Sequence, residues 1–327
     1  MKAARFAAFG APLEVIQVVD EDPGSLAPGE ALVEVLATPI HPSDIATIGG
    51  LYGVLPKLPA VPGNEGVGRV VKVEGEAAVK PGDTVFLPLG AGTWRTHIKT
   101  KAQRLLPVPP GANLHQMAML SINPPTAELM LREFVKLERG EWLIQNAANS
   151  AVGRNLISLA KLEGIKTINV VRRSDVAQEL KALGADVVLE DGEDLPKRVR
   201  EATGGAPLKL AIDAVAGSAT LRLGEAVSPG ATVVNYGSMS LKAPSLSPAA
   251  LIFKNVTLRG FWLVHWMNTT PREAQMALMS RMAKLVMDGT LSVPVDATFP
   301  LENIHEALAR AISGGRQGKV LLTPVKA

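Results

Sequence analysis

The stretch EWLIQNAANSAVGRNLISLAKLEGIKTINVVRR, which spans Glu141–Arg173, decides the fold of this chain. Glu141–Ala147 is an apolar, β-prone run, and Lys166–Val171 is another. Between them, apolar residues recur at helical spacing at Val152, Leu156, Leu159 and Ala160. This order predicts a strand, a tight turn, a helix and a second strand, which is the first βαβ unit of a dinucleotide-binding sheet.

The turn of this unit consists of small residues. Asn149, Ser150, Ala151 and Gly153 allow the backbone to approach a pyrophosphate, and the following helix directs its first N–H groups at such an anion. The glycine pattern G-x-G-x-x-G is absent, since Gly153 is the one glycine in the turn. A βαβ crossover that binds nothing is the alternative. The complete strand–turn–helix–strand order favours a cofactor site.

The end of the second strand indicates which dinucleotide is bound. An acidic residue there would bind the ribose hydroxyls of NAD, but this chain has Arg172, Arg173 and Ser174. Guanidinium groups suit a 2′-phosphate, so the sequence predicts NADPH. The alternative is a solvated pair of arginines, and in either case Ser174 is expected to cap the next helix.

Composition excludes several classes of protein. The chain has 327 residues, which suits two domains, and 47% of them are hydrophobic, enough for sizeable cores. The net charge of +3 is spread along the chain, which argues against nucleic-acid binding. With no cysteine there is no disulfide, thiol catalysis or cysteine-bound metal. No signal peptide or membrane span is recognisable, and a cytoplasmic location is expected.

The pattern of elements changes near residue 122. Residues 1–122 hold short β-prone runs separated by Pro-Gly turns, whereas residues 123–264 alternate helix and strand. The fold class predicted is α/β: a doubly wound parallel sheet beside a β-rich domain. Residues 265–327 begin with a capped helix containing Met276, Met279, Met282 and Met287, which we expect to be core packing. This segment is expected to return to the first domain and complete it.

Several motifs in both halves resemble one known family. They are PSDIATIGGLYGVLPKLPAVPGNEGVGRVV (Pro42–Val71), PGDTVFLPLGAGTWRT (Pro81–Thr96), INPPTAELM (Ile122–Met130), IQNAANSAVG (Ile144–Gly153), INVVRR (Ile168–Arg173), NYGSM (Asn235–Met239) and FKNVTLRGFWL (Phe253–Leu263). The chain resembles the medium-chain dehydrogenase/reductase superfamily, and within it the trans-2-enoyl-thioester reductases of the mitochondrial type and their bacterial relatives. The resemblance implies a Rossmann domain, a GroES-like catalytic domain and a homodimer that joins sheet edges at Thr257–Phe261.

No metal is expected in this chain. Zinc prefers sulfur and nitrogen ligands, there is no cysteine, and Asn64 stands where the zinc-dependent branch has a ligand histidine. The five histidines show no ligand spacing and are expected on the surface or hydrogen-bonded in the core. Without a Lewis acid, a hydride can still add to an alkene conjugated to a carbonyl. The resemblance implies this reaction on an enoyl thioester of CoA or acyl carrier protein.

Tyr52 is the candidate catalytic residue. A phenol is protonated at neutral pH and can donate a proton to an enolate, and the family places this Gly-rich segment beside the nicotinamide. A tyrosine that packs on the substrate or on Pro56 is the alternative. Asp44 is interpreted as a structural cap rather than an acid catalyst.

The resemblance implies further site residues. Asn123 would lie near the nicotinamide ribose, and Lys319 would reach the cofactor or active site. The pyrophosphate would be surrounded by Asn149, Ser150, Ala151 and Val152; the nicotinamide end would be lined by Tyr236, Gly237, Ser238, Met239, Phe261, Trp262 and Leu263. Trp262, Phe261 and Glu128 would form the substrate pocket. The alternative for Phe261 and Trp262 is core or subunit interface.

Some residues depart from the family pattern. His41 stands where Asn is expected, Pro62 and Ala151 replace glycines, and Glu128 replaces an aromatic residue. Ala151 therefore has to avoid positive φ. Two other functions remain open: a zinc-free quinone or alkenal reductase, and a non-catalytic NADPH-binding sensor.

Overall fold

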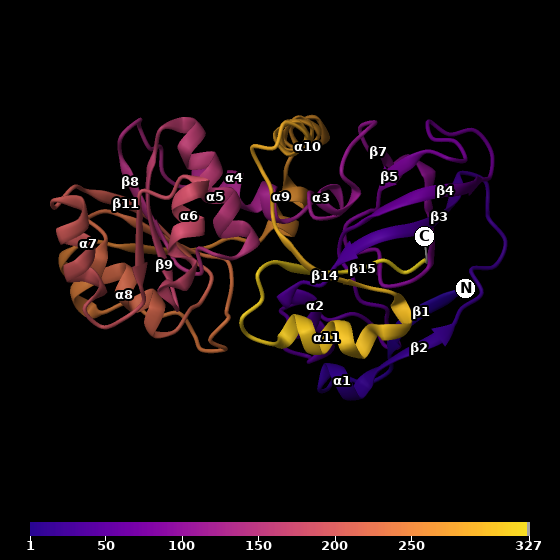
Figure 1. Cartoon of the computed structure of the whole chain (residues 1–327), viewed down its shortest axis with the longest axis horizontal. Helices are drawn as coiled ribbons and strands as arrows, with labels where there is room; N and C mark the ends of the chain where they lie inside the picture. The colour runs from indigo at the N-terminus through magenta and orange to yellow at the C-terminus, as the bar shows by residue number, and fades with distance from the viewer. Residues whose placement is uncertain (326–327) are drawn as a thin grey trace. The chain divides into compact units, whose positions relative to one another are not determined.

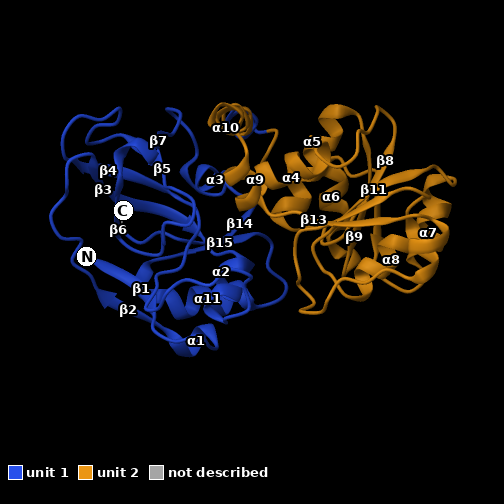
Figure 2. Cartoon of the chain, turned by 180° about the vertical axis from the view of Figure 1, so that it is seen from behind, with its two compact units in different colours: residues 1–122, 283–289, 293–327 blue, residues 123–282, 290–292 orange. Residues whose placement is uncertain are grey.

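The computed structural model describes residues 1–325, and these form two compact units (Figures 1 and 2). One unit comprises residues 1–122, 283–289 and 293–327, and the other comprises residues 123–282 and 290–292. The first boundary coincides with the predicted one at 122/123. The second differs, because residues 265–282 are grouped with the dinucleotide unit rather than with the tail.

The second unit contains a six-stranded parallel sheet with the order β10-β9-β8-β11-β12-β13. Its strands are β8 (Trp142–Gln145), β9 (Lys166–Val171), β10 (Val187–Glu190), β11 (Leu208–Asp213), β12 (Thr232–Asn235) and β13 (Thr257–Gly260). Five of the six residues of β9 and of β11 are buried, as expected for a parallel sheet covered on both faces. The predicted doubly wound α/β architecture is confirmed.

Helices α5 (Ala151–Glu163), α6 (Ala177–Leu183), α7 (Leu195–Thr203) and α8 (Ser218–Ala226) contact the strands of the sheet (Figure 1). The unit also contains α4 (Asn123–Arg132), the π-helix η3 (Ala249–Phe253), α9 (Leu263–Thr269) and most of α10 (Arg272–Met287), whose last residues are grouped with the first unit. Ser150 caps α5, and Gly164 ends it at φ 69°, a conformation that costs glycine little. A buried cluster that includes Ile144, Ile168 and Val233 joins three strands.

The first unit is β-rich, as predicted. A seven-stranded sheet has the order β14-β15-β3-β4-β5-β7, with β6 paired to β3, and β1 and β2 form a separate hairpin. The elements up to residue 122 are β1 (Lys2–Phe6), α1 (Pro12–Val15), β2 (Ile16–Asp20), β3 (Glu30–Pro39), α2 (Pro42–Ile48), β4 (Val67–Val73), β5 (Thr84–Phe86), β6 (His97–Lys101), η1 (Ala102–Arg104), β7 (Leu106–Pro107) and α3 (Leu114–Ala118).

The C-terminal tail completes the first unit. It supplies β14 (Val295–Phe299), η4 (Leu301–Asn303), α11 (Ile304–Ile312) and β15 (Lys319–Leu322), and β15 pairs antiparallel with β3. Ile304 and Leu308 of α11 share a buried cluster with Phe6 and Trp94. The apolar face of α11 therefore needs residues from the other end of the chain to be buried.

Two local predictions were wrong. Of the four methionines of α10, Met282 alone is buried, and Met287 is 44% exposed, because helical spacing does not by itself show how much of a helix is covered. Ser174 does not cap a helix: it is the first residue of the 3₁₀ turn η2 (Ser174–Val176), without a side-chain cap bond. None of the helices within residues 1–325 is both long and apolar enough to cross a membrane.

Candidate functional site

The carboxyl ends of β8 and β11 mark the centre of the site in the second unit. Strands β9 and β10 lie to one side of β8, and β11, β12 and β13 lie to the other, so the strand order reverses between β8 and β11. In doubly wound sheets, ligands bind outside the carboxyl ends of the strands at this reversal. The predicted turn residues follow β8 directly at this place.

The turn after β8 is close to the helix that follows it. Ala147 has φ 47°, and the Ser150 Oγ accepts a hydrogen bond from the Gly153 N–H at 3.1 Å. A Cβ at Gly153 would lie 2.5 Å from the Ala148 carbonyl oxygen, so this position requires glycine. The first N–H groups of a helix lack intrahelical acceptors and favour an anion, which fits a pyrophosphate here.

The other predicted turn residues follow this geometry. Ala151 is the first residue of α5, and its φ is not positive. The residue with positive φ in this turn is Ala147. An alanine in place of the family's glycine is therefore tolerated at position 151, as predicted. Asn149 is exposed, whereas Ala151 and Val152 are buried.

A buried carboxylate organises the next two strand ends. The Asp213 Oδ1 accepts hydrogen bonds from the Asn146 side chain (2.6 Å) and from the N–H groups of Val215 and Ala216 (both 3.0 Å). Its Oδ2 accepts from the Thr220 hydroxyl at 2.6 Å and from the Asn235 side chain at 3.0 Å. Amide and hydroxyl dipoles thus surround a charge that is fully removed from water.

Tyr236 connects this cluster with the turn. Its side chain is hydrogen-bonded to Ser150, and its N–H donates to the Asp213 carbonyl oxygen at 2.9 Å. Burial raises the pKa of the Tyr236 phenol well above its ordinary value, and the Asp213 charge adds to the rise. Gly237 follows, where a Cβ would lie 2.7 Å from the Ala214 carbonyl oxygen. The structure therefore brings Tyr236 against Ser150, and the nicotinamide role of Tyr236 and Gly237 stays a prediction.

Helix α4 contributes an amide without a partner. Asn123 is 4% exposed, and its Nδ2 has no hydrogen-bond partner among the described residues. A buried amide donor in that state favours a ligand acceptor. This fits the predicted contact with the nicotinamide ribose.

Glu128 belongs to an ion-pair network. Its Oε1 accepts from the Nε of Arg132 at 2.6 Å and from the Nε of Arg281 at 3.0 Å, and both arginines also pair with Glu163. The network joins α4, α5 and α10. One carboxylate oxygen is therefore occupied, and the pocket role of Glu128 stays a prediction.

Arg172, Arg173 and Ser174 are exposed where β9 ends. Arg173 contacts Asp175 at 3.5 Å, and both side chains are 61% exposed, so this pair contributes little to stability.

The residues directly after β13 differ in burial. Phe261 packs edge-on against Phe134, Trp262 is 42% exposed and Leu263 is buried. Ser238 and Met239 are exposed in the loop after β12.

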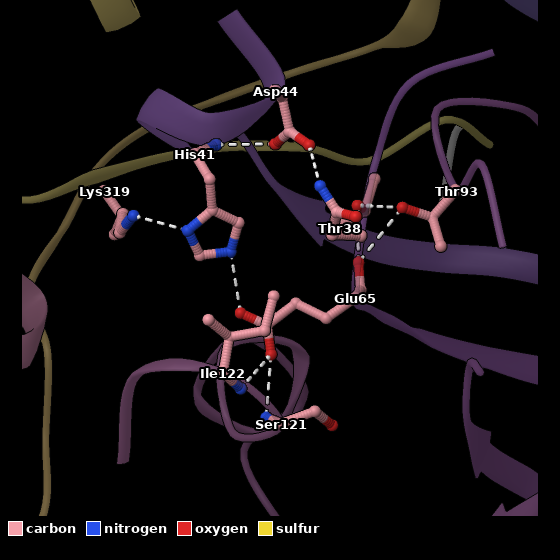
Figure 3. Close-up of polar contacts among 9 residues, drawn as sticks. Thr38, His41, Asp44, Glu65, Thr93, Ser121, Ile122 and Lys319 are labelled. Atoms are coloured by element: carbon pink, nitrogen blue, oxygen red, sulfur yellow. Dashed lines mark hydrogen bonds and ion pairs between the residues drawn. The ribbon is translucent and has the colours of Figure 1, made fainter. Parts of the chain in front are cut away.

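The first unit holds a buried charged network at the start of α2 (Figure 3). The Lys319 ammonium lies 3.0 Å from the Nδ1 of His41, whose Nε2 lies 2.7 Å from Glu65. Glu65 also accepts the N–H groups of Ser121 and Ile122 at 2.7 and 3.0 Å. An ammonium donates to Nδ1, which leaves the Nε2–H to donate to Glu65. We call Lys319, His41, Glu65 and Asp44 the Lys319 network.

Asp44 completes this network and caps α2. It accepts the His41 N–H at 2.8 Å and the Asn64 amide at 2.6 Å, so its predicted structural role is confirmed. Burial raises its pKa to about 6. Burial also raises the pKa of Glu65 to about 8, against the Lys319 charge and two N–H groups, and lowers that of Lys319 to about 8, against the Glu65 charge. Burial, with the Lys319 charge, holds the pKa of His41 well below its usual range.

The donors of this network do not suit zinc. Both ring nitrogens of His41 are engaged, the Asn64 amide faces Asp44, and the sequence has no cysteine. Within residues 1–325 there is no group of three or more acidic or imidazole side chains arranged for a metal ion.

Tyr52 lies on the partly exposed loop after α2, beside the exposed residues Leu51, Val54 and Leu55.

The sequence analysis missed the roles of Glu65 and Asp213. Glu65 stood only as part of a motif of the family, although a glutamate followed by glycine and an apolar strand is a signal of a buried acid. Asp213 at the end of an apolar run carried the same signal.

Comparisons with known proteins agree with this architecture. Residues 151–284 match the family described as zinc-binding dehydrogenase, and residues 27–110 match the alcohol dehydrogenase GroES-like domain. The mitochondrial enoyl-[acyl-carrier-protein] reductase of Rattus norvegicus is 38% identical over 99% of this chain and 88% of its own. The chain belongs to the medium-chain dehydrogenase/reductase superfamily.

Solved structures of this superfamily have the same fold. A protein from Bacillus thuringiensis described as an NADPH:quinone reductase is 30% identical, with a TM-score of 0.90 over 98% of each chain. A complex of Etr1p with NADP and crotonyl-CoA is 29% identical, with a TM-score of 0.87 over 98% of this chain and 99% of that one. The predicted resemblance is confirmed, and relatives at this similarity are oxidoreductases.

Proposed function

We propose that this reductase uses NADPH to saturate the C=C bond of a trans-2-enoyl thioester without a metal ion. The observation that supports it most is the similarity to enoyl-[acyl-carrier-protein] reductases along 99% of the chain. Solved relatives contain NADP or are described as NADPH-dependent. When bound, NADPH supplies a hydride to Cβ of the substrate, and a proton reaches Cα.

Each part of this task has candidate residues. The α5 N-terminus and Ser150 would hold the pyrophosphate, the amide of Asn123 would hold the ribose or nicotinamide side, and Arg172 with Arg173 would hold the 2′-phosphate. Tyr52 donates the proton to Cα or positions the thioester. Charge on the thioester oxygen is met by hydrogen-bond donors rather than by a Lewis acid, since the donors at the Lys319 network do not suit zinc.

The decisive experiment compares substrates. NADPH oxidation is followed with crotonyl-CoA, a longer enoyl-CoA, a quinone and a 2-alkenal at matched concentrations. We expect the enoyl thioesters to be reduced with the highest kcat/KM. Activity with the quinone alone would overturn the proposal in favour of a quinone reductase, the function that the Bacillus thuringiensis structure favours. Binding of NADPH without any turnover would indicate a sensor.

The role of Tyr52 has its own test. Tyr52→Phe removes the hydroxyl and keeps the ring, so turnover should fall about 10²-fold or more while NADPH binding persists, because general acid catalysis contributes that much. Fluorescence titration of NADPH and stopped-flow turnover measure the two quantities. Turnover equal to that of the native protein would remove Tyr52 from the mechanism.

We also infer that two copies associate through the edge strand β13. Leu251, Ile252 and Phe253 of η3, just before β13, are 48%, 70% and 83% exposed. A solved thioester reductase from Candida tropicalis is a heterodimer. Sedimentation equilibrium should show a dimer that Phe253→Lys converts to a monomer. A native protein that sediments as a monomer would exclude this assembly.

A cytoplasmic location stays a prediction.

A further inference from the structure

Arg154 is a buried arginine in the second turn of α5. Its side chain is 8% exposed, and its Nη2 lies 2.6 Å from the Oε1 of Glu179. Its Nε donates to the carbonyl oxygen of Asn149 at 3.3 Å. One planar guanidinium group therefore bonds the turn after β8 and a side chain of α6 at the same time.

Helix α6 is short and packs on the turn through apolar contacts. It has seven residues, and Leu180 is its only buried one. Leu180 packs in a cluster with Ala148 of the turn and Val171 at the end of β9, and the partly buried Val176 and Leu183 pack against the same cluster. Apolar contacts are not directional, so they restrict the rotation of a short helix weakly. The ion pair from Arg154 to Glu179 is directional and adds a restraint on this rotation.

The segment between β9 and α6 carries the arginines assigned to the 2′-phosphate. It comprises residues 172–176, and Arg172, Arg173 and Ser174 are exposed. One end is held by the buried Val171, and the other leads into α6. The turn itself is fixed to β9, because the Ala148 N–H donates to the Val170 carbonyl oxygen at 3.2 Å. The orientation of α6 therefore influences where the exposed guanidinium groups lie relative to the turn.

We propose that Arg154, through Glu179, is a positioning residue for NADPH specificity. This inference rests on the proposed function, because it assumes that residues 172–174 bind the 2′-phosphate. Arg154 and Glu179 set the spacing between the pyrophosphate turn and the 2′-phosphate segment. NADH has a ribose hydroxyl in place of the 2′-phosphate, so its binding depends much less on this segment.

The test uses two nucleotide fragments. Adenosine 2′,5′-bisphosphate carries the 2′-phosphate, and ADP carries a pyrophosphate without it; both are titrated calorimetrically into the purified full-length protein. Glu179→Ala, at a half-exposed position, should weaken adenosine 2′,5′-bisphosphate about tenfold and ADP less than about twofold. Arg154→Met should produce at least the same loss, and the double variant should add nothing to it. Glu179→Gln, which keeps an acceptor, should recover part of the affinity.

Matched controls separate the outcomes. Arg198→Met removes an arginine from the i,i+4 pair with Asp194 on α7 and should leave both affinities unchanged. Melting curves confirm that each variant is folded. In steady-state assays, the Glu179 and Arg154 variants should raise the KM for NADPH relative to that for NADH and leave kcat nearly unchanged. An unchanged ratio of the two fragment affinities, or equal loss of both, would overturn the inference.

Arg172→Ala combined with Arg173→Ala distinguishes this failure from failure of the proposed cofactor site. We expect the double variant to lose adenosine 2′,5′-bisphosphate binding and to raise the KM for NADPH far more than that for NADH. If it does so while the Glu179 and Arg154 variants bind normally, only the positioning role is wrong. If it has equal effects on both cofactors, the 2′-phosphate site and the positioning role both fail.

Discussion

The two units bury carboxylates in contrasting ways. In the dinucleotide unit, Asp213 is bonded by five amide or hydroxyl donors. In the β-rich unit, Glu65 and Asp44 are buried beside an ammonium and an imidazole, in the Lys319 network. Both solutions satisfy buried charge, but the first uses fixed dipoles and the second uses side chains that titrate. The first therefore sets geometry, whereas the second also makes the unit respond to pH.

The two clusters also differ in how far apart their members lie along the chain. Asp213 is bonded by Val215, Ala216 and Thr220, which follow it closely in sequence, and by asparagines at the ends of the flanking strands. Lys319 lies 278 residues from His41. The Lys319 network therefore forms only when the tail has paired with the rest of the β-rich unit. We expect substitutions in this network to lower stability more than substitutions at Asp213.

Loss of the buried ammonium should have the largest effect. Lys319→Met removes the cation that faces the buried Asp44, and breaking a buried ion pair destabilises a fold by about 3–5 kcal/mol. Urea unfolding of the cofactor-free protein at pH 7 measures the loss. The loss should shrink at pH 5, because Asp44, whose pKa is about 6, then takes up a proton. Lys99→Met, at an exposed position of the same unit, is the control and should change stability by less than about 0.5 kcal/mol. Equal effects of both variants would show that the network is energetically neutral.

Asp213→Asn should have a smaller effect. The amide keeps the shape and one acceptor oxygen but places an N–H₂ group against donors, so we expect a loss of about 1.5–3 kcal/mol, the contribution of a hydrogen bond to a charged group. Urea unfolding at pH 7 measures the loss. A variant as stable as the native protein would show that the five hydrogen bonds to Asp213 are energetically neutral.

The pH dependence of stability gives the smallest and most specific effect. Glu65 titrates near 4.5 in an unfolded chain, and burial raises its pKa to about 8, so the folded state binds more protons between these values. Stability must then fall as pH rises through this window. The windows of Asp44 and His41 end near pH 6 and 6.5, and the lowered pKa of Lys319 acts in the opposite direction only above about 8.

Between pH 6.5 and 7.5, Glu65 therefore determines most of the slope in this network. We expect the native protein to lose about 1 kcal/mol of unfolding free energy across this range and Glu65→Gln to lose much less, with urea unfolding at four pH values as the measurement. A slope that survives in Glu65→Gln would assign it to other groups.

The sequence predicted the dinucleotide unit in most of its detail. Lys166–Val171 has the predicted bounds, because a parallel strand covered on both faces is a continuous apolar run with abrupt ends. It also predicted that Asp44 caps a helix and that Ala151 does not have a positive φ. The methionines of α10 and the cap at Ser174 were wrong, since helical spacing and residue type do not show which face finds a partner.

The sequence by itself determined the order of elements, the small turn at 147–153 and the arginines after β9, because each depends on residues that are neighbours along the chain. Only the tertiary structure decided that Lys319 reaches His41, that Arg154 connects the turn to α6, and that Asn123 keeps an amide without a partner among the described residues. The physical reason is that burial and hydrogen-bond pairing are properties of groups brought together across many residues, and no local pattern encodes the partner.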